Sequence, residues 1–204
     1  MWIKACSLLV QRGLLPAVIT RKIIHVTSAP FFVLMWPLYS SSNLRARVWA
    51  ASVPALSILQ LVATGLRSNA TRVNERDMHG SDLVQCTSRS GAAEEVLRGP
   101  LLYSIVLFFA TLIGFRDSPA AVITIAQLAI GDGCADIFGR IFGKRKWWPL
   151  LTSGVGKSME GSVAFVVSAF VGSLALLHWL GLEPQSRLVI VVLGISILSA
   201  VAEI

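Results

Sequence analysis

The chain has 204 residues, of which 54% are hydrophobic and 14% are charged, and its mean hydropathy is +0.70. This composition excludes a disordered chain, a secreted disulfide scaffold and a coiled coil, and it predicts a membrane protein. Lys and Arg outnumber Asp and Glu by 18 to 11, which gives a net charge of +7. In a membrane protein this excess favours anionic lipid headgroups or a phosphorylated substrate as the partner, and we expect no nucleic acid.

Uncharged stretches follow one another along the chain and predict an all-α, multi-pass bundle of about six to seven spanning helices. The stretches cover 23–44, 48–66, 99–115, 118–131, 161–182 and 188–202. A bilayer core needs about 20 helical residues, so three of the runs are long enough and three are short. Residues 1–20 predict a separate helix or surface segment ahead of a polytopic membrane domain over 21–204.

A tight helical hairpin is predicted at residues 116–117, the charged pair between the third and fourth runs. Ser118 and Pro119 resemble an N-cap followed by proline at the first helical position. The helix that begins there is expected to continue through Asp132 and Asp136, whose carboxylates must face protein or water rather than lipid.

The basic residues gather on one predicted face of the membrane. Twelve of the 18 Lys and Arg residues lie in 21–22, 67–98 and 140–157, and four lie on the opposite face. The positive-inside tendency makes the rich face cytoplasmic, or stromal or matrix in an organelle. A polar loop over 67–98 and a catalytic loop over 132–162 are therefore expected on one side.

The densest polar cluster lies where the fourth run ends. Asp132, Asp136 and Arg140 are four residues apart, so on a helix the two carboxylates and the guanidinium form one stripe. Mg²⁺ is usually held by one or two carboxylates together with substrate phosphates, so Asp132 and Asp136 are the candidate metal ligands. The alternative is an ordinary ion pair between Asp136 and Arg140.

Glycines and lysines surround this stripe. Gly139 and Gly143 would let the backbone approach either a phosphate or a neighbouring helix, and Lys144 begins a basic run that could bind anionic groups. Further along, Gly156-Lys157-Ser158 is not a P-loop, because Leu151 stands where the Walker pattern needs glycine. It predicts a glycine-rich loop with Lys157 free to reach a phosphate, or else a simple turn before a helix.

Two more basic segments are ambiguous on their own. Arg21 and His25 lie one turn apart at the start of the first run, where they could simply anchor the helix at the membrane surface. Arg98 precedes Gly99 and Pro100 at the junction of a loop and a helix, where it could be a solvated charge.

Four segments, in order, resemble the CTP-dependent polyprenol kinases, and among them the phytol and farnesol kinases. Residues 21–25 are similar to the opening Arg-Lys-x-x-His of these enzymes, and 94–103 to their Glu-Leu-Leu-Lys/Arg-Gly-Pro-Leu-Tyr-Tyr segment. Residues 131–143 resemble the motif Gly-Asp-Gly-x-Ala-Asp-x-x-Gly-Arg-x-x-Gly, and 157–162 resemble Lys-Ser-x-x-Gly-Ser. Dolichol kinases and phosphatidate cytidylyltransferases share the same elements.

The resemblance implies a membrane kinase that transfers the γ-phosphoryl of CTP to an isoprenoid alcohol such as phytol, farnesol or geranylgeraniol. The prenyl tail would dissolve in the bilayer, and the hydroxyl would be presented at its rim. Mg²⁺ is the implied cofactor, bound by Asp132 and Asp136. Lys157 would neutralise charge on the transferred group, and His25 or a carboxylate would be the general base. Contacts to CTP are implied for Arg98, Gly139, Arg140, Gly143, Lys144 and Ser158.

The resemblance also leaves alternatives open. A cytidylyltransferase would attach CMP to a lipid phosphate, and a non-catalytic membrane relative would only bind partners. The family usually continues past the helix that ends here at Glu203, so a shortened chain is expected. Residues 146–153 are also less polar than in the subgroup. A chloroplast membrane is the favoured location, with the endoplasmic reticulum as the alternative.

Overall fold

A computed structural model describes residues 17–39, 43–70, 99–144, 158–183 and 185–202. Every regular element within these residues is helical, which confirms the all-α prediction. The elements, in chain order, are α2 (Ala17–Leu34), η1 (Trp36–Leu38), α3 (Leu44–Ala70), α6 (Gly99–Phe109), η3 (Ala110–Gly114), η4 (Phe115–Asp117), α7 (Pro119–Ala126), η5 (Gln127–Gly131), α8 (Asp132–Phe142), α9 (Met159–Trp179) and α10 (Ser186–Ala202).

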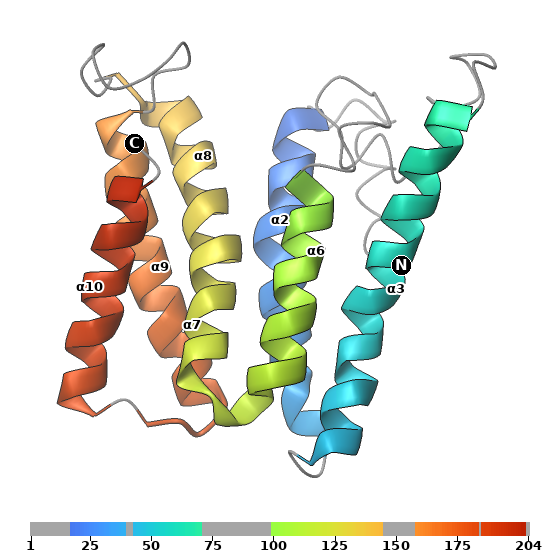
Figure 1. Ribbon diagram of the computed structural model, residues 1–204. Coiled ribbons are helices and arrows are strands. Elements are labelled where there is room, and N and C mark those ends of the chain that lie inside the picture. The colour runs from blue at the N-terminus through green and yellow to red at the C-terminus, as the bar shows by residue number, and fades with distance from the viewer. Residues whose placement is uncertain (1–16, 40–42, 71–98, 145–157, 184, 203–204) are drawn as a thin grey trace. The chain divides into compact units, whose positions relative to one another are not determined.

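Each predicted apolar run forms a helix, but not all of these helices have full membrane length (Figure 1). Four are long and apolar enough to cross a bilayer, namely Leu44–Thr64, Gly99–Asp117, Pro119–Phe142 and Met159–Trp179. The helices Lys22–Leu38 and Ser186–Ala202 are apolar but shorter. The segment Lys22–Leu38 includes the short 3₁₀ turn that contains Pro37 and follows the end of α2 at Leu34. An all-α membrane helical bundle is thus confirmed, because the part of the chain that the structure describes has six helices, four of which are long enough to span a bilayer.

The turn predicted at residues 116–117 is present. Phe115, which begins the short 3₁₀ turn η4, has a positive φ of 45°, a conformation that non-glycine residues rarely adopt outside turns. Pro119 occupies the start of α7 as expected, although the Ser118 side chain makes no capping hydrogen bond. The helix then continues through α7, η5 and α8 to Phe142, as predicted, and forms one column in Figure 1.

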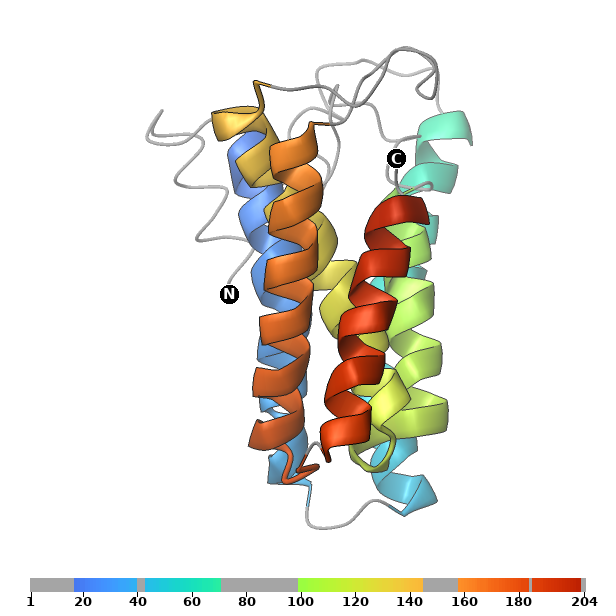
Figure 2. The same cartoon turned by 90° about the vertical axis from the view of Figure 1, so that its left-hand side faces the viewer.

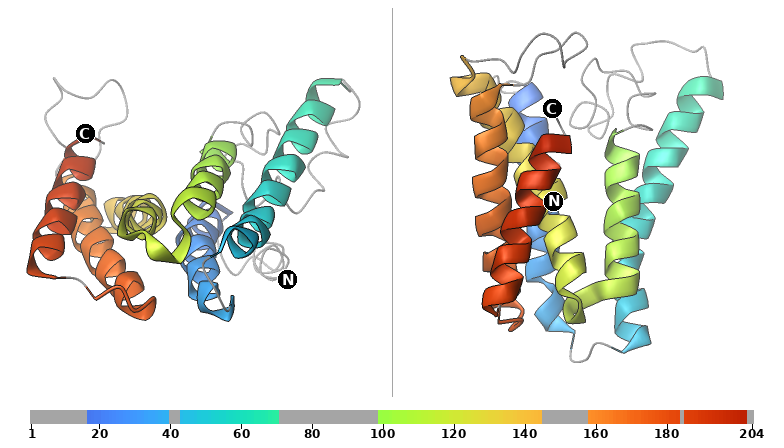
Figure 3. Two further views of the ribbon diagram at one scale, coloured as in Figure 1. Left: turned by 60° about the horizontal axis from the view of Figure 1, so that its bottom comes forward. Right: turned by 60° about the vertical axis from the view of Figure 1, so that its left-hand side comes forward.

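The described residues fall into two compact units. The first combines residues up to Ile24 with Leu44–Leu112, and in it α3 and α6 pack side by side (Figure 3). The second combines His25–Asn43 with Ile113–Ile204, and it contains the later part of α2 together with α7, α8, α9 and α10. His25, Asp132, Asp136 and Arg140, the described residues of the candidate site, belong to the second unit.

Helix α9 is the centre of the second unit, because α7, η5, α8 and α10 all contact it (Figure 2). Phe165 and Ala169 of α9 pack against Ala200 of α10 in its core. A Cβ atom on Gly131 would lie 2.9 Å from the Phe165 ring and 3.1 Å from Ala169. The glycine therefore lets the α7–α8 column approach α9 closely, as small residues do between membrane helices.

Aromatic side chains close one end of the second unit. Trp36 and Phe115 are both fully buried, with ring centroids 5.1 Å apart, and Tyr39 lies edge-on to Phe115 at 5.7 Å. Arg116 donates a hydrogen bond of 2.7 Å to the Tyr39 carbonyl. These contacts join the turn after α2 to the turn before α7.

A buried polar pair joins the α7–α8 column to α10. The Ser196 hydroxyl donates to the Val192 carbonyl at 2.9 Å, so its oxygen accepts from Gln127 Nε2 at 2.8 Å. Both side chains are buried within apolar helices. A hydrogen bond in such surroundings is worth about 1–2 kcal/mol.

Removal of the Ser196 hydroxyl should therefore destabilise the second unit. We expect Ser196→Ala to lower the free energy of unfolding by about 1 kcal/mol, because Gln127 loses its acceptor. The matched control is Ser173→Ala, which removes an equally buried hydroxyl that donates to Ala169 of its own helix. Melting temperatures of the purified variants in detergent measure the difference, and equal melting temperatures would contradict the role given to the pair.

Candidate active site

The polar stripe predicted on α8 is present. Asp132 opens the helix, and its side chain is 39% exposed, whereas that of Asp136 is 25% exposed. The Nε atom of Arg140 lies 3.0 Å from Oδ2 of Asp136, which makes the i, i+4 ion pair that the sequence also allowed. Because the Arg140 guanidinium is more exposed than the carboxylate that it pairs with, it can also contact a further anion.

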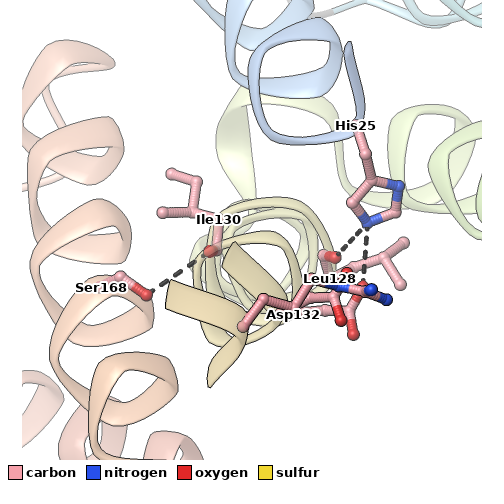
Figure 4. A network of polar contacts seen from close by, with 7 residues as sticks. His25, Leu128, Ile130, Asp132 and Ser168 are labelled. Carbon is pink, nitrogen blue, oxygen red and sulfur yellow. Dashed lines mark hydrogen bonds and ion pairs between the residues drawn. The ribbon is translucent and has the colours of Figure 1, made fainter. Parts of the chain in front are cut away.

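The structure brings His25 to Asp132. His25 lies on α2, and its Nε2 atom is 3.3 Å from Oδ2 of Asp132 and 3.0 Å from the carbonyl oxygen of Leu128 (Figure 4). The histidine is 24% exposed and faces the first turn of α8. His25 can act on a substrate held at Asp132 only if α2 packs beside α8. Within the second unit the part of α2 that carries His25 does contact the start of α8.

A glycine on α8 permits this approach. A Cβ atom on Gly133 would collide with the side chain of Val26 and would lie 3.5 Å from the His25 ring. Any larger residue would therefore push α2 away and separate His25 from Asp132. In the sequence Gly133 stood out only as part of a glycine-rich motif. In the structure it packs against Val26 of α2.

A π-helical turn, η5, precedes Asp132, and sequence patterns did not predict it. The Asp132 amide donates to the carbonyls of Gln127 and Ala129, whereas in an α-helix it would donate to that of Leu128. The Leu128 carbonyl is thereby available to His25. The Ile130 carbonyl is 3.4 Å from the Ser168 hydroxyl of α9, at the long limit of a hydrogen bond (Figure 4). The sequence offered two signals for this turn and its contacts, namely the polar residues Gln127 and Ser168 within apolar runs.

Ser158, Gly139 and Gly143 lie together where α8 meets α9. Ser158 is the N-cap of α9, and its hydroxyl accepts a 3.1 Å hydrogen bond from the amide of Gly161. A Cβ atom on Gly139 would be 3.1 Å from that hydroxyl, and one on Gly143 would be 2.7 Å from it. Here the glycines face a neighbouring helix, which was one of the two alternatives that the sequence left open.

For the remaining predicted site residues, the structure gives few or no contacts. Lys144 is exposed just beyond the end of α8. Lys157 and Arg98 lie outside the described residues, and so do residues 145–157 of the predicted catalytic loop and most of the polar loop at 67–98. The structure thus unites four of the predicted residues, His25, Asp132, Asp136 and Arg140.

The carboxylates fit Mg²⁺ only in combination with a substrate. Among the described residues no group of three or more His, Cys, Asp or Glu side chains could hold a metal ion. A protein cage of the kind that binds calcium is therefore not formed by these residues. Asp132 and Asp136, one helical turn apart, match the donor set that holds Mg²⁺ against phosphates.

Fold and site together define an all-α helical membrane protein with a polar, paired-carboxylate cluster on one of its apolar helices. Comparison with curated proteins shows what the chain is similar to. The chain is 36% identical to a probable chloroplastic phytol kinase of Triticum aestivum, over 98% of the chain and 65% of that protein. It is 37% identical to phytol kinase 1 of Arabidopsis thaliana, over 84% of the chain and 52% of that protein. The farnesol kinase of the same plant is 32% identical, over 95% of the chain and 60% of that protein.

This similarity to phytol and farnesol kinases runs along most of the chain and confirms the resemblance seen in its motifs. It spans about half to two thirds of the length of these curated relatives. No family model matches the chain, and no solved structure matches it.

Proposed function

We propose that this protein is a chloroplast membrane kinase that transfers the γ-phosphoryl of CTP to the hydroxyl of an isoprenoid alcohol. The names of its relatives support a kinase acting on phytol or farnesol in the chloroplast. The observation that carries the proposal is the cluster on α8, in which Asp132 contacts His25 and Asp136 contacts Arg140. Carboxylates and cations on a single stripe suit metal-assisted phosphoryl transfer.

Each residue has a distinct task in the proposed reaction. Bound Mg²⁺ would neutralise the phosphate oxygens and polarise the transferred group. Asp132 and Asp136 supply the carboxylates that hold it. Arg140, half exposed beside Asp136, contacts the phosphates of CTP and stabilises charge on the transferred group. Lys144, exposed just beyond the end of α8, and Lys157, which precedes α9 in the sequence, add positive charge in the proposed reaction.

The transfer forms one bond and breaks one bond. The alcohol oxygen attacks the γ-phosphorus of CTP, the bond from that phosphorus to the β-bridging oxygen breaks, and CDP leaves. The hydroxyl proton passes to a base, for which His25 and a carboxylate are the two candidates. Because the acceptor alcohol is lipid-soluble, apolar helices around the site can deliver it from the bilayer.

A labelling experiment tests the proposal. Membranes that contain this chain should transfer label from [γ-³²P]CTP to phytol, farnesol or geranylgeraniol and yield a prenyl monophosphate. Membranes from the same host without the chain are the control. Label that reaches lipid from [α-³²P]CTP instead would identify a cytidylyltransferase, and no labelled lipid from either nucleotide would support a non-catalytic relative.

A further inference from the structure

The contacts of His25 define how this residue acts in the proposed kinase site. Its Nε2 atom faces two oxygen atoms, the Leu128 carbonyl at 3.0 Å and Oδ2 of Asp132 at 3.3 Å. A carbonyl oxygen can only accept a hydrogen bond, and so can an ionised carboxylate. Nε2 must therefore carry a proton that both oxygens share.

The π-helical turn creates this arrangement. The Asp132 amide bypasses the Leu128 carbonyl and donates to those of Gln127 and Ala129. In an uninterrupted α-helix the Leu128 carbonyl would receive the Asp132 amide, and it would have less capacity for a side chain. π-Helical turns occur often at functional sites, and here the turn presents a backbone acceptor beside the first carboxylate of the site.

We infer that His25 is a positioning residue, which donates from Nε2 to the Leu128 carbonyl and to the Asp132 carboxylate and so fixes the orientation of that carboxylate. This inference rests on the proposed function for its catalytic meaning. The carbonyl fixes the tautomer of the ring, as backbone carbonyls do for histidines in metal sites. Nε2, the ring nitrogen beside the Asp132 carboxylate, then has no lone pair with which to take the proton of an alcohol.

Two substitutions separate positioning from proton transfer. The amide nitrogen of His25→Gln reaches about as far from the backbone as Nε2 does, and it donates a hydrogen bond but cannot serve as a base. His25→Ala removes both abilities. If His25 positions Asp132, the kcat of His25→Gln for γ-phosphoryl transfer should exceed that of His25→Ala by about tenfold, the value of one hydrogen bond. The KM for CTP and for the alcohol should differ little between the two variants.

The matched control is His178→Ala. Nδ1 of His178 lies 3.1 Å from Oε1 of Glu183, so it is another histidine–carboxylate pair, but its side chain is 76% exposed at the end of α9. Its loss should leave transfer at the wild-type rate. Equal inactivity of His25→Gln and His25→Ala, with both present in membranes at the wild-type level, would overturn the inference in favour of a base.

A spectroscopic measurement decides the same question without any reaction. The imidazole ¹⁵N shifts of the histidine-labelled chain in detergent show which ring nitrogen carries a proton, and the signals that vanish in His25→Gln belong to His25. A protonated Nε2 supports the inference, and an unprotonated Nε2 overturns it. If the wild-type chain transfers no phosphate, the proposed function fails while this measurement still decides the contact of His25.

Discussion

Asp132→Asn is expected to lower phosphoryl transfer from CTP by at least about 10³-fold while the helices stay folded. The substitution keeps the shape of the side chain and an oxygen that can accept from His25, but it removes the negative charge. In the proposed function that charge would hold Mg²⁺ against the phosphates, and electrostatic stabilisation dominates phosphoryl transfer. Initial rates with [γ-³²P]CTP at saturating alcohol measure the loss.

The control for this prediction is Glu183→Gln. Glu183 also pairs with a histidine, His178, but its side chain is 74% exposed beyond α9. The same loss of charge there should leave the rate unchanged. Near-normal transfer by Asp132→Asn, or an equal loss in both variants, would show that the carboxylate of Asp132 does not serve the reaction as proposed.

Gly161→Val is expected to destabilise the second unit by about 1–3 kcal/mol and to abolish most of its activity. A Cβ atom at this position would lie 3.0 Å from the Ala135 carbonyl and 3.3 Å from Cα of Gly139. Both neighbours are backbone atoms of α8, so no side-chain rotation can make room. Helix α8 would have to move away from α9, and the polar stripe would move with it.

Gly194→Val supplies the comparison. Gly194 lies within α10, and a Cβ atom there would meet nothing within 4 Å. Both variants add the same side chain to an apolar helix, so only the crowding differs. Melting temperatures in detergent and transfer rates should separate the two variants, and similar melting temperatures would mean that α8 and α9 tolerate a wider spacing than the structure shows.

The sequence alone predicted much of the fold, because hydrophobic length is a direct physical requirement of membrane helices. It also predicted the continuation of the fourth run past Asp132, since a glycine and an acidic residue do not by themselves end a helix. Uncharged composition alone did not reveal where α2 ends, before the 3₁₀ turn at Trp36–Leu38.

The candidate site was predictable only in part. The spacing of Asp132, Asp136 and Arg140 fixed their common stripe, because neighbours on a helix follow from its period. The contact between His25 and the turn before α8 joins residues 103 positions apart and depends on tertiary packing. The sequence did not indicate the π-helical turn either. Side-chain patterns do not determine which carbonyl oxygen a backbone amide donates to. The roles proposed for the site residues stay predictions.

The position of Asp132 along its helix has a consequence for the product of the proposed reaction. The column Pro119–Phe142 continues for 13 residues before Asp132 and for 10 after it. At 1.5 Å per residue these parts measure about 20 Å and about 15 Å, so a bilayer crossed by the whole column holds Asp132 at depth, well below the headgroups. In the proposed reaction an alcohol would lose its proton and gain a dianionic group while still immersed in hydrocarbon. Arg140, further along α8, and Lys144 just beyond its end would then have to draw that anion towards the water, which would make release of the product a demanding step.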